Sequence, residues 1–227
     1  METIIQILAR ELGQKEQYVE NVVKLLDDGN TVPFIARYRK EMHGTMDDQT
    51  IRQLADRLAY LRGLDERRTE VRDAIEAQGK LTDELAAAIQ EAQTLAALDD
   101  LYRPYRPKRR TRASIAREKG LEPLAAAILA ARTSSPALEA LAKPYIYPEK
   151  GVETAEDALA GAGDIIAEDL SDDANLRGRL RALLHRTGVL KTVGTDEDDT
   201  IYTMYHDFSE PVRRLQSHRV LAINRGE

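Results

Sequence analysis

Apolar residues recur at intervals of three and four positions between Asp47 and Gln78, which is the spacing that gathers side chains on one face of an α-helix. Two consecutive acids, Asp47 and Asp48, mark the start of this stretch. The pattern predicts one long helix that runs to about Gln78, and a helix of that length bridges or supports other elements. Its apolar stripe consists of Ile51, Leu54, Leu58, Leu61, Val71 and Ile75.

The same periodicity continues through most of the chain. Hydrophobic residues make up 42% of the sequence but aromatic residues only 5%, so the core must consist mainly of Leu, Ile, Val and Ala, as in packed helices. Glycines and prolines such as Gly120 and Pro144 punctuate the pattern. Shorter helices are expected over residues 82–92, 94–102, 114–119, 121–132, 136–142, 154–169 and 172–187.

Two helices are expected before the long one, with Gly13 closing the first. The spacing of Ala9, Gly13 and Val19 is that of a helix-turn-helix motif. The second helix and its flanks carry Lys15 and Lys24 against four acids, a net charge of −2 that phosphates would repel. We therefore expect this motif to serve packing. The apolar stripes consist of Ile4, Ile5, Leu8 and Leu12 in the first helix and Val19, Val22, Val23 and Leu26 in the second.

Residues 31–41 are expected to form a short helix. Thr31 is placed to cap it, and Pro33 falls in its first turn, where a proline is tolerated. Phe34, Ile35 and Tyr38 are expected to face inward.

A strand pattern occurs only over residues 189–193 and 200–204, with an acidic turn at 194–199 between them. The expected fold class is therefore all-α and multi-helical, with the helix-turn-helix-like motif, the one long helix and at most a short β-hairpin near the C-terminus. We expect two regions: 1–80, with the motif and the long helix, and 81–227, a second helical region.

Motifs for catalysis, metals or cofactors are missing from the sequence. There is no cysteine, the four histidines are far apart, and no phosphate-binding glycine loop occurs. The acids Asp196, Glu197, Asp198 and Asp199 are contiguous, which is typical of a solvated turn rather than a two-metal site. No window is long and apolar enough to span a membrane, and no secretory signal occurs. We expect a cytoplasmic protein that is not an enzyme, has no cofactor and does not contact a membrane.

One short segment has the opposite charge to the rest of the chain. Residues 103–119, the basic segment, hold eight Lys or Arg and one acid, Glu118, whereas the whole chain has a net charge of −6. A charge of about +7 in this segment attracts a polyanion such as a nucleic-acid backbone. Tyr102 and Tyr105 add flat faces on which a base could stack. The candidate binding residues are Arg103, Tyr105, Arg106, Lys108, Arg109, Arg110, Arg112, Arg117 and Lys119.

The alternative for this segment is structural. Arginines flanked by tyrosines and prolines also make packing loops, and this chain has 39 acids that could pair with them. Asp99 and Asp100, just upstream, are candidate partners. The fraction of the eight basic side chains that is exposed and unpaired distinguishes the two interpretations: exposure of five or more favours phosphate binding, and burial against acids favours scaffolding.

Three strings carry a resemblance to a known family. They are 29–41 (GNTVPFIARYRKE), 98–124 (LDDLYRPYRPKRRTRASIAREKGLEPL) and 217–227 (SHRVLAINRGE). Together they resemble the Tex family of bacterial transcription accessory proteins, which are similar to a eukaryotic elongation factor of the same architecture. The resemblance runs from the first helix to the last residue.

The resemblance implies a cytoplasmic, nucleic-acid-binding protein that takes part in transcription. Full-length members resemble a series of modules: an N-terminal helical region, an RNase H-like domain, helix-hairpin-helix motifs and a C-terminal oligonucleotide-binding barrel. By this comparison the chain is an N-terminal fragment that stops before the RNase H-like domain. Because the barrel carries the main affinity in the family, we expect only weak binding by this fragment.

Two functions are expected. The first is a non-enzymatic N-terminal scaffold whose basic segment contacts the phosphates of RNA or single-stranded DNA. The second is a protein-interaction module that docks the remaining domains or the transcription machinery, such as RNA polymerase, without touching nucleic acid.

Overall fold

A computed structural model describes residues 2–131, 138–194 and 202–226. The chain divides into two compact units, Met1–Leu98 and Asp99–Glu227. Helices dominate the described residues, and one two-stranded sheet accompanies them, so the expected all-α fold class with a short C-terminal hairpin is confirmed. The α-helices are α1 (Ile4–Leu12), α2 (Glu16–Asp27), α3 (Val32–Tyr38), α4 (Lys40–His43), α5 (Asp48–Glu76), α6 (Asp83–Glu91), α7 (Leu95–Tyr102), α8 (Arg112–Glu118), α9 (Glu122–Ala130), α10 (Leu138–Ala142), α11 (Ala155–Asp172), α12 (Ala174–Thr187) and α13 (Ser217–Gly226).

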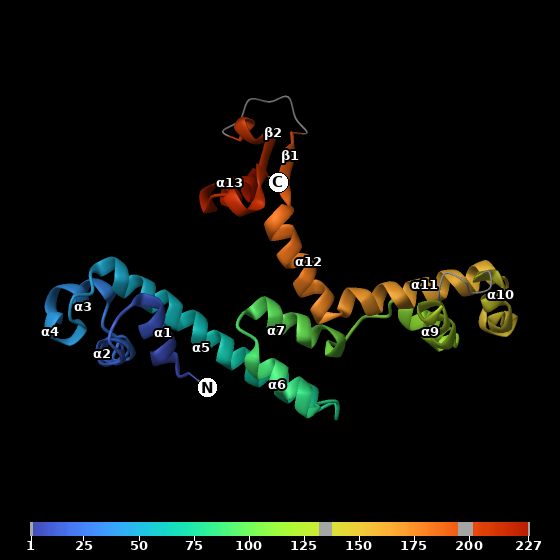
Figure 1. Ribbon diagram of the computed structural model, residues 1–227, viewed down its shortest axis with the longest axis horizontal. Helices are drawn as coiled ribbons and strands as arrows, with labels where there is room; N and C mark the ends of the chain where they lie inside the picture. The colour runs from blue at the N-terminus through green and yellow to red at the C-terminus, as the bar shows by residue number, and fades with distance from the viewer. Residues whose placement is uncertain (1, 132–137, 195–201, 227) are drawn as a thin grey trace. The chain divides into compact units, whose positions relative to one another are not determined.

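The first unit is built on α5, the predicted long helix, against which α1, α2 and α3 pack (Figure 1). Asp47 caps α5, because its side chain accepts a hydrogen bond from the Thr50 amide at 2.8 Å. The whole predicted stripe of α5 is buried, as is Leu64, which extends it. The core of this unit contains Leu8, Val19, Val22, Ile35, Ile51 and Leu54, all fully buried.

The turn between α1 and α2 is formed by Gly13, as expected. Its φ of +62° lies in the left-handed region, and its amide hydrogen bonds to the carbonyls of Ala9 and Arg10. At the other end of α1, Thr3 and Gln6 form a capping box. Both ends of α1 are therefore specified by local hydrogen bonds.

Residues 31–41 form two short helices, where we expected one. Arg39, with φ −128°, separates α3 from α4. Thr31 precedes α3 without a side-chain cap, and Ile35 is fully buried. Tyr38 is 64% exposed, so its inward placement was wrong: it is the last residue of α3, and its ring lies against the half-buried Phe34 at the surface, with 5.4 Å between the centroids.

The second unit has a core of small residues between α8, α9, α10 and α11. Gly161 allows Leu121 to approach α11 closely, since a Cβ at this position would lie 2.4 Å from Cδ1 of Leu121. Three short 3₁₀-helices connect the α-helices: η1 (Arg103–Tyr105), η2 (Lys143–Tyr145) and η3 (Pro148–Lys150). The core consists of Ala113, Ala116, Leu121, Leu124, Ala125, Ala142, Val152, Ala158, Ala162 and Ile165.

The hairpin pairs β1 (Val189–Val193) with β2 (Asp207–Pro211) in antiparallel register, from Val189 opposite Pro211 to Val193 opposite Asp207. The first strand was predicted correctly. The second was placed too early: residues 203–205 form the 3₁₀-helix η4, whereas the predicted turn residues 195–199 lie outside the described ranges. Phe208 of β2 packs against Tyr205 of η4, with 5.5 Å between the ring centroids.

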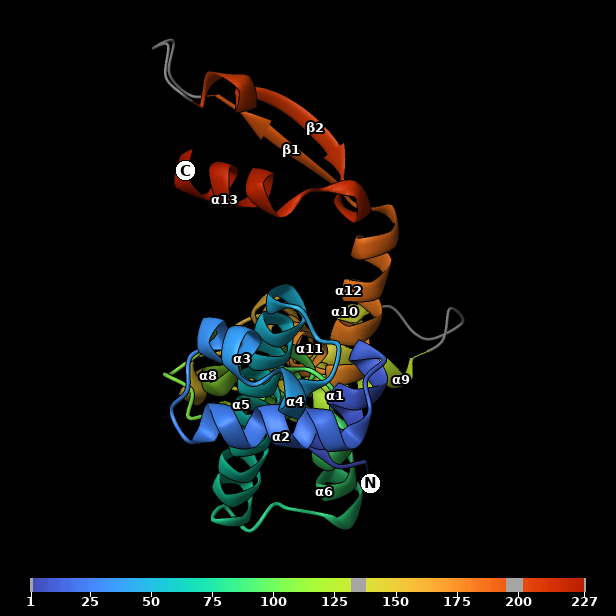
Figure 2. The same cartoon turned by 90° about the vertical axis from the view of Figure 1, so that its left-hand side faces the viewer.

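Helix α13 follows β2 through the 3₁₀-helix η5 (Val212–Arg214) and lies beside the hairpin (Figure 2). It was not among the helices expected from the sequence. Arg219 of α13 pairs with Glu210 of β2 at 2.6 Å, which fastens the helix to the strand. No helix within the described ranges is both long and apolar enough to cross a membrane.

Candidate nucleic-acid interface

The basic segment begins where α7 ends and finishes one residue after α8. Arg103, Pro104 and Tyr105 form the single turn η1, and Arg106 then continues in an extended conformation. Thr111 begins α8 with a capping box: its hydroxyl accepts from the Ser114 amide at 3.0 Å, and Ser114 accepts from the Thr111 amide at 2.9 Å. The segment is therefore held at both ends by local structure.

One face of α11 binds the inner half of the basic segment. Arg117 pairs with Glu168 at 2.6 Å and with Asp169 at 2.5 Å. Asp172 pairs with Arg103 at 2.9 Å and also with Lys108. The Thr111 hydroxyl, which already caps α8, donates to Glu168 at 3.0 Å. Arg103, Lys108 and Arg117 are thus neutralised by α11, and a fourth cation, Arg112, makes a longer contact with Asp164 of the same helix.

The pKa values follow these contacts. Burial by itself would raise the pKa of Glu168, but hydrogen bonds from Arg117 and Thr111 and the charge of Lys108 outweigh it, so this pKa lies below its ordinary value. Burial would likewise raise the pKa of Asp172, but hydrogen bonds from Lys108 and Arg103 outweigh that effect and lower it. The hydrogen bond that Arg117 donates to Glu168 raises the pKa of Arg117. All these groups are charged near neutral pH.

The outer half of the segment is more exposed. Arg110 is 70% exposed and pairs with Glu118 at 3.0 Å, while Arg112 is 87% exposed and lies 3.6 Å from Asp164. Arg109 is exposed, and its side chain makes no hydrogen bond or ion pair with any residue that the structure describes. Arg109 and Arg110 line a hollow whose other side is formed by Glu168, Asp169 and Asp172 of α11, whereas Arg112 lines a second hollow together with Asp164.

The remaining predicted residues lie at the two ends of the segment. Arg106 pairs with Asp99 at 2.7 Å and lies over the Tyr102 ring, 5.5 Å from its centroid. Tyr105 is half-buried. Lys119 donates to the Gly151 carbonyl at 2.8 Å. The expected partner Asp100 instead binds Arg177 and Arg181 of α12, at 2.6 Å each.

Sequence reasoning missed the acidic partners on α11. Asp164, Glu168 and Asp172 are four residues apart and so share one helix face, a spacing that is visible in the sequence. Nothing in that spacing says which distant segment the face meets. Within the described ranges no group of three or more His, Asp or Glu side chains is placed to hold a metal ion.

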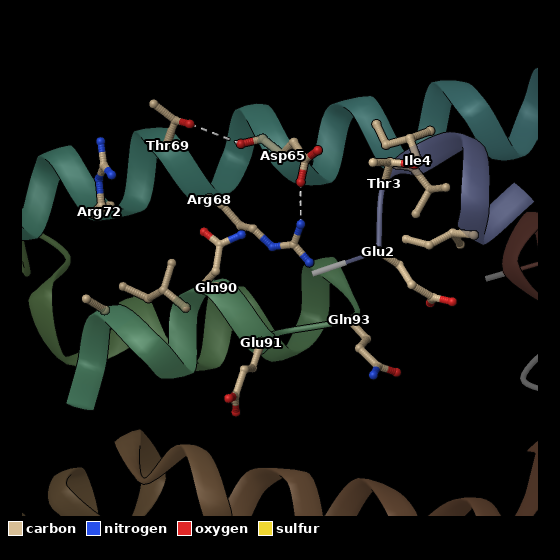
Figure 3. A pocket seen from close by; sticks show the side chains of 14 residues that line it. Glu2, Thr3, Ile4, Asp65, Arg68, Thr69, Arg72, Gln90, Glu91 and Gln93 are labelled. Atoms are coloured by element: carbon tan, nitrogen blue, oxygen red, sulfur yellow. Dashed lines mark hydrogen bonds and ion pairs between the residues drawn. The ribbon is translucent and has the colours of Figure 1, made fainter. Parts of the chain in front are cut away.

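The first unit has a hollow of its own between α5, α6 and the start of α1 (Figure 3). Arg68 crosses it, paired with Asp65 on α5 and donating to the Ala92 carbonyl at the end of α6 at 2.6 Å. Arg68 therefore fastens α6 to α5, and the hollow combines acids, amides and arginines without a dominant charge.

The helical fold and the clamped basic segment define a class of protein: a multi-helical protein with a cationic segment held against a neighbouring helix. A family model described as the Tex-like protein N-terminal domain matches residues 2–76, and one described as Tex central region-like matches residues 132–227. The chain therefore belongs to the Tex family.

Relatives in bacteria and animals agree with this assignment. The chain is 52% identical to "Protein tex" of Bordetella pertussis over 98% of its own length and 28% of that protein. It is 46% identical to "Transcriptional accessory protein Tex" of Neisseria gonorrhoeae, again over 98% of this chain and 29% of the relative. The human "S1 RNA-binding domain-containing protein 1" is 30% identical over 99% of this chain and 23% of its own length. The chain thus spans less than a third of these relatives.

Proposed function

We propose that this chain is the non-enzymatic N-terminal scaffold of a cytoplasmic, nucleic-acid-binding transcription accessory protein. In this proposal the basic segment contacts the phosphates of RNA or single-stranded DNA. The observation that carries it is the exposure of Arg109, Arg110 and Arg112 next to a segment fixed on α11. The names of the relatives, which include transcription accessory and S1 RNA-binding proteins, support a ligand of this class.

The inner and outer cations of the basic segment have different roles in this proposal. Arg103, Lys108 and Arg117 would have to leave their carboxylates to bind a phosphate, so they hold the segment in place. Arg109 has no such partner among the described residues, and the pairs of Arg110 and Arg112 are solvent-exposed and weak. The outer three arginines are the ones available to a polyanion.

The test is the salt dependence of binding to a fluorescent oligouridylate. Each phosphate contact contributes about 0.7 to the slope of log affinity against log salt, so replacing Arg109, Arg110 and Arg112 with Ala should reduce the slope by about 2. A matched control replaces three exposed arginines of the first unit, Arg10, Arg52 and Arg72, with Ala. An unchanged slope in the first variant would reject this surface.

A second candidate function is docking of the rest of the protein or of the transcription machinery. It is favoured by the carboxylate partners that α11 supplies to the inner cations, which is how packing loops are built. Under this candidate the Arg109, Arg110 and Arg112 variant keeps its nucleic-acid affinity but loses binding to the separately expressed remainder of the protein.

A further inference from the structure

Helix α12 is basic along its whole length and carries no acid. Its 14 residues, Ala174–Thr187, include four arginines and a histidine. None of its residues is buried, and every residue from Arg179 onward is exposed. Figure 1 shows this helix leading from α11 toward the hairpin. Exposed arginines on such a helix can bind an anionic ligand, whereas the cations in the inner half of the basic segment are already paired with carboxylates.

The two faces of α12 differ. Arg177 and Arg181 turn to the buried carboxylate of Asp100 and bind it at 2.6 Å each. Arg179 and Arg186 are seven residues apart, about two helical turns or 10.5 Å along the axis, and so share a different face. Neither makes a hydrogen bond or ion pair with any residue the structure describes. The pairing to Asp100 therefore anchors the helix and leaves the second face open.

An apolar side chain lies between the two free arginines. Leu183 is four residues after Arg179 and three before Arg186, which places it on the same face, and it is 44% exposed. An Arg–Leu–Arg stripe offers charge to a phosphate backbone and an apolar contact to an unstacked base. A duplex hides its base faces, so the stripe suits a single strand.

The 3₁₀-helix η5 adds two more cations at the end of α12. The Val212 amide donates to the Gly188 carbonyl at 2.9 Å, which joins η5 to the residue after the helix. Arg213 and Arg214 follow directly, both exposed and both with side chains that pair with nothing in the described ranges.

The local charge balance favours an anionic ligand. Residues 174–225 hold nine Lys or Arg and six acids, so their net charge is +3 in a chain whose net charge is −6. Glu210 is bound to Arg219 at 2.6 Å, and Asp207 begins β2 at the end of the strand away from η5. The acids at 196–199 lie outside the described ranges.

We propose that α12 and η5 form a second nucleic-acid site, in which Arg179, Arg186, Arg213 and Arg214 bind the phosphodiester backbone of a single strand. The proposal rests on the ligand class of the proposed function but uses none of the same residues. Unpaired cations neutralise phosphates, and so release the counterions condensed on the strand, without first breaking an ion pair. This site therefore contributes more to the salt dependence of binding than the basic segment does.

The experiment measures the affinity of the whole chain for an oligouridylate of about 15 nucleotides between about 50 and 200 mM salt. Replacing Arg179, Arg186, Arg213 and Arg214 with Ala should lower the salt slope by about 2.8, at about 0.7 per contact. Replacing the same four with Lys should keep the slope, because the charge is retained. The control replaces Arg10, Arg37, Arg52 and Arg72 with Ala and should also keep it.

The outcomes separate this site from the basic segment. Circular dichroism confirms that each variant retains its helices, and the Lys variant tests the site independently of any loss of fold in the Ala variant. If the Ala variant keeps the wild-type slope while the Arg109, Arg110 and Arg112 variant loses it, the α12 site is rejected and the proposed function stands. The reverse result supports α12 and rejects the basic segment. Absence of binding by the wild-type chain at about 50 mM salt rejects both and leaves the open face of α12 to a protein partner.

Discussion

At the scale of single residues, Gly13 shows how one backbone angle limits the sequence. Its φ of +62° is a conformation that residues with a Cβ adopt at a cost, while the space around it is open, since a Cβ at this position would meet no neighbouring atom within 4 Å. Any effect of a side chain there must come from backbone strain rather than from a clash. Gly63, inside α5, also has open space but no positive φ.

We expect Gly13→Val to destabilise the chain by about 1–2 kcal/mol because Val has to adopt a left-handed conformation. Thermal unfolding followed by circular dichroism measures this as a lower melting temperature. Gly63→Ala is the control and should leave stability unchanged or raise it by up to about 1 kcal/mol, since Ala is the better helix former. Equal melting temperatures for wild type and Gly13→Val would contradict the strain argument.

Prediction from sequence was most accurate for the roles of single residues. The roles of Gly13, Asp47 and the α5 stripe follow from local hydrogen bonding and helical period, and all were correct. Tyr38 was misplaced because its position depends on where α3 ends, and the break at Arg39 has no marker such as Gly or Pro in the sequence.

At the scale of elements, the prediction of the candidate site depended on where the helices begin and end. The helix expected over 154–169 continues to Asp172, and the helix expected over 172–187 begins at Ala174, with Asp173 as its cap. That difference moves Asp172 onto the face of Glu168, where it binds Arg103 and Lys108. The contacts of α11 with the basic segment join residues more than fifty positions apart, and local patterns carry no information about them.

The same contacts predict a pH dependence. Glu168 and Asp172 have lower pKa values in the folded chain than their ordinary values of 4.5 and 3.8, so the unfolded chain binds more protons and stability rises with pH. Their contribution is complete above the ordinary values and is lost as the pH falls through the folded ones. Replacing Glu168 with Gln and Asp172 with Asn should cost about 1–3 kcal/mol at pH 7, and this gap should close toward pH 3.

Chemical denaturation of both proteins at several pH values measures the gap. Glu118→Gln is the control, because its pair with Arg110 is exposed and should contribute little at any pH. A gap that stays constant from pH 7 to about 3 would show that the two carboxylates do not act through their charge.

At the scale of the whole molecule, the two units have separate cores. Leu54 is fully buried in the first core and Leu124 in the second, and the two clusters share no residue. Each core is large enough to unfold as a cooperative unit of its own.

We therefore expect calorimetry to resolve two unfolding transitions. Leu54→Ala and Leu124→Ala should each destabilise one unit by about 2–5 kcal/mol, so each variant should shift a different transition. One transition that moves equally in both variants would mean that the units unfold together.

The hydrogen bonds of Thr111 have a consequence for how these sequences diverge. The Thr111 hydroxyl accepts from the Ser114 amide, which caps α8, and donates to Glu168. Glu168 also accepts a hydrogen bond from Arg117. Loss of any one of the three removes a hydrogen bond from a half-buried polar group, so an isolated replacement is at a disadvantage. Among relatives, positions 111, 117 and 168 should therefore be inherited and replaced together, a covariation that joins the basic segment to α11 across about fifty residues.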